Sequence, residues 1–207
     1  NEALVGYLGQ LKTIELVSQW LANQSAQQIV IDPVMGDQGS LYPGLSPELP
    51  VAMRQLVQQA TVITPNATEL KLLADINPHR VLNDNLTKVC LEKLWASGYQ
   101  GAVVLTGIAH GDQISCQLWR HPEQPSLTVT TPARPGHFYG TGDAFAALLS
   151  GLLHYRLPLE QAVQQANQLL QIAVQETAEL KPTDRKYGLQ LSQLMRAISG
   201  LQLTKSN

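Results

Sequence analysis

This sequence of 207 residues has little charge, little cysteine and no long apolar run. Charged residues make up 14% of it, the net charge is −2, and lysine and arginine form no cluster, so we expect no nucleic-acid-binding surface. The two cysteines, Cys90 and Cys116, lie far apart without metal-ligand spacing, which indicates reduced thiols in a cytoplasmic protein. No apolar run reaches the length that crosses a bilayer, so we expect no membrane partner.

Hydrophobic residues, by contrast, make up 44% of the chain, and this share argues against disorder. A chain of 207 residues can bury one sizeable core and is short for two. We therefore predict a single domain over residues 1–207.

Short apolar segments alternate with segments of helical periodicity. Strands are predicted at 28–32, 61–64 and 102–106, and an amphipathic helix at 11–21. Residues 114–118 alternate between apolar and polar, which predicts a half-exposed antiparallel strand. Wholly apolar strands between helices are typical of a parallel sheet with helices on both faces.

The remaining predicted elements are strands at 3–7 and 127–129, a loop at 33–50, helices near 48–57, 67–74 and 84–94, and helices after Asp143 that break near Pro158 and between Lys181 and Gly188.

Polar residues follow the three apolar strands where each ends. Ligands of open parallel sheets bind beyond the carboxyl ends of the strands, and magnesium prefers oxygen ligands. Asp32, Asp37 and Glu69 offer such oxygens, directly or through water. The other polar residues at these strand ends are Thr64, Asn66 and Thr106.

Each of these residues also has an ordinary structural explanation. Asp32 precedes a proline and could start a turn, and Asp37 could be a solvated turn residue. Asn66 and Glu69 have the spacing of a helix capping box. Thr106 could satisfy a backbone group at a strand end.

The segment 137–145 places glycines directly before an apolar helical run. A helix that starts at Gly140, Thr141 and Gly142 offers unpaired amide groups and a positive dipole end to an anion. Asp143 would lie in the first turn beside that anion. An anion site next to a carboxylate is what phosphoryl transfer to a hydroxyl requires. A glycine turn followed by a helix-capping aspartate is an alternative explanation of the same residues.

In the order of these segments, the chain resembles the pyridoxal and pyridoxamine kinases of the ribokinase-like superfamily. The matching segments are Gly6–Gly9, Val30–Asp37 with Gly39–Tyr42, Thr64–Leu70, Val104–Gly107 and Gly140–Phe145. The resemblance implies a doubly wound α/β fold with a mostly parallel sheet and helices on both faces. It also implies transfer of phosphate from ATP to the 5′-hydroxyl of pyridoxal, pyridoxamine or pyridoxine, by a homodimer.

The resemblance assigns roles to the residues quoted above. Asp143 would take the hydroxyl proton of the substrate, and Gly140, Thr141 and Gly142 would present amides to the migrating phosphoryl group. Tyr7 would pack against the pyridine ring. The cation and nucleotide side would consist of Asp32, Asp37 and Glu69 around Mg²⁺ or a monovalent cation, Thr64 and Asn66 in the same shell, and Thr106 near the nucleotide.

Three alternatives stay open. Hydroxymethylpyrimidine kinases share the fold but usually carry cysteine where this chain has Asp143, and sugar kinases of the superfamily usually carry alanine where it has Thr141. A non-catalytic vitamer-binding protein or truncated paralogue is the third. Family members begin with strands that carry a serine for the pyridine site, and we expect these either to precede Asn1 in a longer protein or to be missing from a truncated one.

Overall fold

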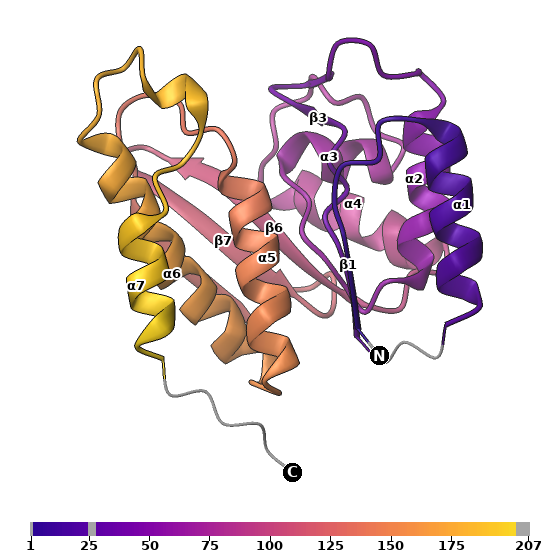
Figure 1. The fold of residues 1–207 in the computed structure, drawn as a ribbon. Coiled ribbons are helices and arrows are strands. Elements are labelled where there is room, and N and C mark those ends of the chain that lie inside the picture. The colour runs from indigo at the N-terminus through magenta and orange to yellow at the C-terminus, as the bar shows by residue number, and fades with distance from the viewer. Residues whose placement is uncertain (1, 25–27, 202–207) are drawn as a thin grey trace.

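A six-stranded sheet forms the centre of the protein, in the order β1-β2-β5-β6-β7-β8 (Figure 1). The structure is a computed structural model, and it describes residues 2–24 and 28–201. Strands β1, β2, β5 and β6 are parallel, whereas β7 pairs antiparallel with β6 and with β8. The strands are β1 (Glu2–Val5), β2 (Gln28–Ile31), β5 (Val62–Ile63), β6 (Ala102–His110), β7 (Gln113–Trp119) and β8 (Leu127–Pro132).

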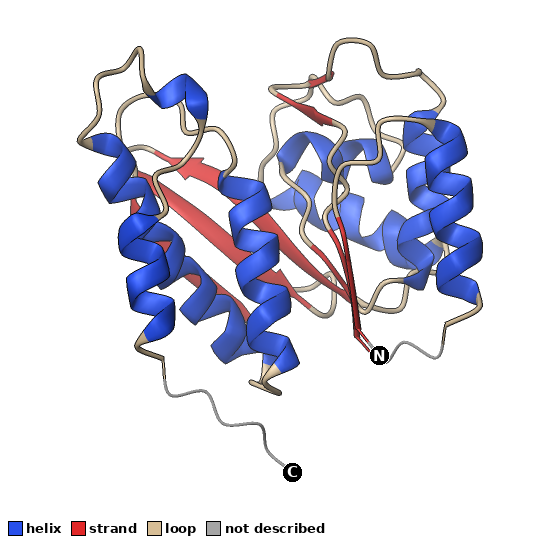
Figure 2. Ribbon diagram, viewed as in Figure 1, coloured by secondary structure: helices blue, strands red, loops and turns tan. Residues whose placement is uncertain are grey.

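Helices cover both faces of the sheet, as predicted (Figures 1 and 2). One face carries α1 (Leu11–Ala22), α2 (Leu49–Leu56), η1 (Val57–Gln59), α3 (Ala67–Leu73) and α4 (Asp84–Ala96). The other face carries α5 (Thr141–His154), α6 (Leu159–Ala178) and α7 (Ser192–Ser199), with η2 (Arg185–Tyr187) before α7. The predicted helix breaks near Pro158 and between Lys181 and Gly188 are confirmed.

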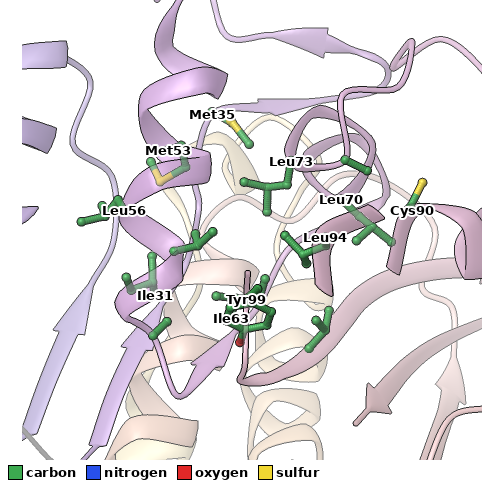
Figure 3. Packing of buried hydrophobic residues seen from close by; sticks show 14 of the residues in the cluster. Ile31, Met35, Met53, Leu56, Ile63, Leu70, Leu73, Cys90, Leu94 and Tyr99 are labelled. Atoms are coloured by element: carbon green, nitrogen blue, oxygen red, sulfur yellow. The ribbon is translucent and has the colours of Figure 1, made fainter. Parts of the chain in front are cut away.

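The sheet separates two hydrophobic clusters, because successive side chains of a strand point to opposite faces. Ile31 of β2 joins the first cluster, where it lies with Met53 and Leu94 (Figure 3). Its neighbour Val30 joins the second cluster with Phe145 of α5. Strand β2 is therefore apolar on both faces, which is why it reads as a continuous apolar run in the sequence.

A small hairpin, β3 (Gly36–Asp37) and β4 (Ser40–Leu41), forms within the segment predicted as a loop. Gln38 and Gly39 connect its strands with φ of 51° and 84°, and positive φ at both positions is the geometry of a type I′ turn. The prediction was wrong here because strands of two residues leave no periodicity to detect.

The described residues, 2–24 and 28–201, contain no helix long and apolar enough to cross a bilayer.

Candidate active site

The carboxyl ends of β2 and β5 bring Asp32 and Thr64 together. The Thr64 hydroxyl donates a hydrogen bond of 3.0 Å to Asp32 Oδ1. Both residues are buried, with 5% of Asp32 and 3% of Thr64 exposed. The two strands are adjacent and parallel, and their neighbouring ends place these polar side chains at one edge of the sheet.

Burial raises the pKa of Asp32 to about 6. The hydrogen bond from Thr64 favours the ionised form and opposes that rise, whereas the charge of Asp143 adds to it. Asp32 and Asp143 are therefore close enough for their charges to interact, although they lie 111 positions apart in the sequence (143 − 32).

The start of α5 lies against Asp32. Gly140 has φ of 85° and ψ of 9°, a left-handed conformation that glycine adopts without strain, and the helix begins at the next residue. A Cβ built on Gly142 would lie 3.7 Å from Asp32 Oδ2. The first amides of an α-helix have no partner within the helix, so this end of α5 offers donors to an anion beside a carboxylate. The exposed side chain of Asp143 lies in the same turn.

The predicted capping box at the start of α3 is confirmed. Asn66 Oδ1 accepts hydrogen bonds from the amides of Thr68 at 2.8 Å and Glu69 at 3.0 Å. Glu69 Oε2 in turn accepts from the Asn66 amide at 2.9 Å. The structural explanation of these residues is therefore correct, and any role toward a ligand is additional to it.

The same first turn of α3 also holds the β3–β4 hairpin. Three hydrogen bonds join them: Asn66 Nδ2 donates to Gly36 O at 2.8 Å, the Met35 amide donates to Glu69 Oε1 at 3.2 Å, and the Gly39 amide donates to Thr68 Oγ1 at 2.9 Å. The hairpin carries Asp37, whose Oδ1 accepts from the Gln38 amide at 2.8 Å. Asp37 is thus positioned by α3 and not by the main sheet.

Burial raises the pKa of Glu69 to about 8, against the opposing effect of the backbone amides that it accepts. Both carboxyl oxygens already accept a backbone hydrogen bond. Within the described ranges, no group of three or more His, Cys, Asp or Glu side chains is arranged to hold a metal ion by itself. The magnesium set of Asp32, Asp37 and Glu69 stays a prediction, and it requires phosphate oxygens or water as further ligands, which is the usual situation for Mg²⁺.

Tyr42 lies close enough to these carboxyl groups for their charges to affect its phenol. It was not predicted as a site residue. Its amide donates to Met35 O at 3.0 Å, directly after the hairpin. Burial is the main effect that raises the pKa of its phenol to about 12. Four carboxyl groups contribute to the same rise: Glu69, Asp37, Asp32 and Asp143. The phenol is therefore harder to ionise than that of an ordinary tyrosine.

Thr106 and Tyr7 lie at the margins of this arrangement. The Thr106 amide donates to Pro65 O at 2.9 Å and its hydroxyl approaches the same oxygen at 3.4 Å, so its described contacts are structural. Tyr7 is 58% exposed and lines a separate hollow of about 470 Å³ together with Pro43 and Leu45. The loop that follows Tyr42 thus forms one side of the hollow that contains Tyr7.

Comparison with known proteins places this chain in a family. The family model described as phosphomethylpyrimidine kinase matches residues 2–187. The chain belongs to this family. The resemblance to kinases of the ribokinase-like superfamily is therefore confirmed.

Similar solved structures confirm the fold. A pyridoxal kinase from Lactobacillus plantarum is 38% identical, with a TM-score of 0.87 over 96% of this chain and 70% of its own. A putative phosphomethylpyrimidine kinase from Bacteroides thetaiotaomicron, crystallised with pyridoxal, is 30% identical, with a TM-score of 0.83 over 99% of this chain and 73% of its own.

Curated relatives carry two different activity names. A hydroxymethylpyrimidine/phosphomethylpyrimidine kinase from Haemophilus influenzae is 31% identical over 82% of this chain and 63% of its own length. A pyridoxine/pyridoxal/pyridoxamine kinase from Bordetella avium is 33% identical over 81% of this chain and 57% of its own length. Among eight curated relatives that it matches, the chain spans between 38% and 64% of the relative's length.

Proposed function

We propose that this family member transfers the γ-phosphoryl group of ATP to the 5′-hydroxyl of a vitamin B6 vitamer. The observation that carries the proposal is the junction of Gly140, Gly142 and Asp143 with Asp32, where helix amides and two carboxyl groups meet. Support also comes from relatives that are named for this activity.

In the proposed reaction the hydroxyl oxygen of the substrate attacks the γ-phosphorus. The bond from that phosphorus to the oxygen of the β-phosphate breaks, ADP leaves, and the hydroxyl proton passes to the carboxylate of Asp143. Asp143 suits this role because its side chain is exposed at the site rather than buried. The first amides of α5, from Thr141 and Gly142, would stabilise the charge of the migrating group.

The donor set fits a magnesium ion bound with the nucleotide. Asp32 and Asp37 would hold the ion, Glu69 would contact it through water, and Thr64 and Asn66 would position these carboxylates. The ion, or a monovalent cation beside it, would neutralise phosphate charge and lower the cost of keeping Asp32 ionised in a buried place. Thr106 is proposed to approach the nucleotide, and Tyr7 the pyridine ring from its hollow.

Hydroxymethylpyrimidine phosphorylation is the second candidate. It is favoured by the family description and by the Haemophilus influenzae relative. Both substrates are aromatic nitrogen heterocycles with a hydroxymethyl group, so the same phosphate site would serve either. Asp143, at the position where hydroxymethylpyrimidine kinases usually carry cysteine, is the reason for preferring the vitamer.

We also propose a cytoplasmic homodimer. Both cysteines, Cys90 and Cys116, are buried free thiols, which suits a reducing compartment. The dimer rests on the resemblance alone.

One assay separates these activities. ADP release is measured with pyridoxal, pyridoxine, pyridoxamine, hydroxymethylpyrimidine and ribose at equal concentrations, and the vitamers are expected to react fastest. Faster turnover of hydroxymethylpyrimidine would establish the second candidate, and nucleotide binding without turnover of any substrate would establish a non-catalytic protein.

Asp143→Asn is the matching variant, and we expect it to lower kcat by about 10²- to 10⁴-fold while ATP still binds. Asp84→Asn is its control, because Asp84 also lies in the first turn of a helix, on the other face of the sheet. Near-full turnover by Asp143→Asn would remove the proposed base.

A further inference from the structure

The guanidinium group of Arg185, in η2, joins two segments of backbone. It caps the end of α6, where Nη2 donates to Ala178 O at 2.6 Å and Nε donates to Leu180 O at 3.2 Å. Carbonyl groups at the end of a helix lack partners within the helix, so a cation there is favourable. The third bond runs elsewhere, from Nη1 to Pro135 O at 2.8 Å, in the loop between β8 and α5.

That loop is shaped to receive the guanidinium group. Gly136 has φ of 105°, and a Cβ built on it would lie 2.9 Å from Arg185 Nη1. A residue with a Cβ would be strained at this φ, and its Cβ would displace the end of the Arg185 side chain from its present position. The Phe138 ring lies under the same group, with its centroid 5.3 Å from Arg185 Cζ, which is within the range of a cation–π interaction.

The loop continues directly into the start of α5. The Thr141 hydroxyl donates to Phe138 O at 3.3 Å, so the residue over which Arg185 lies is hydrogen-bonded to the first residue of the helix. Gly188, which ends η2, lies beside Tyr139 O, since a Cβ built on it would be 3.8 Å from that oxygen. The segment that carries Arg185 therefore contacts the loop at Pro135 and Phe138 and lies close to Tyr139, just before Gly140.

We propose that Arg185 is a positioning residue for the glycine turn that opens α5. By fixing Pro135 and Phe138 to the end of α6, it holds loop 133–139 in the conformation that orients the amides of Thr141 and Gly142. Its consequence for catalysis rests on the proposed kinase function. Arg185 would act on the phosphate side only, because Leu8 and Leu45, which line the hollow with Tyr7, pack against the first hydrophobic cluster.

The first test is hydrogen exchange in the full-length protein without ligands, which does not depend on activity. Arg185→Ala is expected to speed the exchange of amides in residues 133–142 and to leave α4 unchanged. The control is Lys186→Ala, because Lys186 is the exposed neighbour whose described contact is with the Tyr187 ring. Unchanged exchange in 133–142, or faster exchange confined to the end of α6, would overturn the proposal.

The second test is kinetic. Arg185→Ala is expected to lower kcat by about 10- to 100-fold and to raise KM for ATP, since displacement of reacting groups by about 1 Å has effects of that size. KM for the vitamer should stay within about twofold, because the substrate side is untouched. Millimolar guanidinium chloride should restore part of the rate and methylammonium chloride should not, because only the planar group supplies donors in the required directions.

Arg185→Lys provides a variant that keeps the charge and is expected to fold even if Arg185→Ala does not. It should show the same exchange and kinetic changes in weaker form, because one ammonium group cannot reach all three carbonyl oxygens in the geometry of the fork. Wild-type kinetics in both variants would overturn the proposal. An inactive wild-type protein would refute the kinase function instead, and the exchange experiment would still decide the role of Arg185.

Discussion

Replacing Thr64 with valine removes the hydrogen bond that favours the ionised form of Asp32. Valine has nearly the shape of threonine and Thr64 is 3% exposed, so the burial of Asp32 should not change. The perturbation therefore isolates one of the effects that set the pKa of this carboxyl group, which is about 6 in the native site.

The size of the change follows from the charge on the acceptor. A hydrogen bond to a charged group contributes about 1.5–3 kcal/mol, and one pKa unit corresponds to about 1.4 kcal/mol. We therefore expect Thr64→Val to raise the pKa of Asp32 by roughly 1 to 2 units, from about 6 to ~7–8.

The shift also has a consequence for stability. The pKa of Asp32 is about 6 in the fold, above its ordinary value of 3.8. Its contribution to stability is therefore full below pH 3.8 and is lost as pH rises through about 6. In Thr64→Val the loss should continue to ~8.

The direct assay is a ¹³C NMR titration of the aspartate carboxyl carbons, supported by urea unfolding across the same pH range. Thr61→Val is the control, because the Thr61 hydroxyl is hydrogen-bonded to Ile29 O at the opposite edge of the sheet. An unchanged or lowered pKa of Asp32 in Thr64→Val would refute this account of the site.

Three further predictions concern stability. Gly36→Ala would place a Cβ 2.3 Å from Ser40 O, so we expect it to lower the free energy of unfolding in urea by about 1–3 kcal/mol. Gly6→Ala is the control and should cost far less, because no atom lies within 4 Å of a Cβ built there. Equal losses in the two variants would contradict the close approach at Gly36. Burial raises the pKa of Glu69 from 4.5 to about 8, so its contribution to stability is full below 4.5 and is lost as pH rises through 8. The difference in unfolding free energy between the wild type and Glu69→Gln should therefore shrink between about pH 5 and 8. A difference that grows over this range would contradict the prediction. Leu149→Ala should cost about 2–5 kcal/mol, because Leu149 is fully buried, and a loss under ~1 kcal/mol in calorimetry would show that its cluster is loosely packed.

The main sheet could be predicted because its central strands are buried on both faces, and such strands stand out as apolar runs. Strand β6 was predicted only to Thr106, although it continues to His110. A bulge interrupts its pairing with β7 between Leu105 and Ile108, and the strand beyond it is largely exposed. The apolar signal therefore ends where burial ends, while the backbone pairing goes on.

The candidate site could be predicted where it depends on strand ends and on the start of a helix. Its hairpin could not, since Met35, Gly36 and Gly39 are held by hydrogen bonds to the first turn of α3, which residue patterns do not reveal. The capping box predicted from Asn66 and Glu69 was correct. That the same two side chains also hydrogen-bond the hairpin segment could be recognised only in the tertiary structure.

The candidate site draws on both sides of the sheet. Asp143 belongs to a helix that packs in the second hydrophobic cluster, whereas Met35, which adjoins the hairpin, and α3 pack in the first. A ligand that contacts both groups would link the two helical layers. Its binding free energy would oppose local unfolding of either layer alone. Bound nucleotide should therefore make the two helical layers unfold more cooperatively, which calorimetry would show as a single, sharper transition.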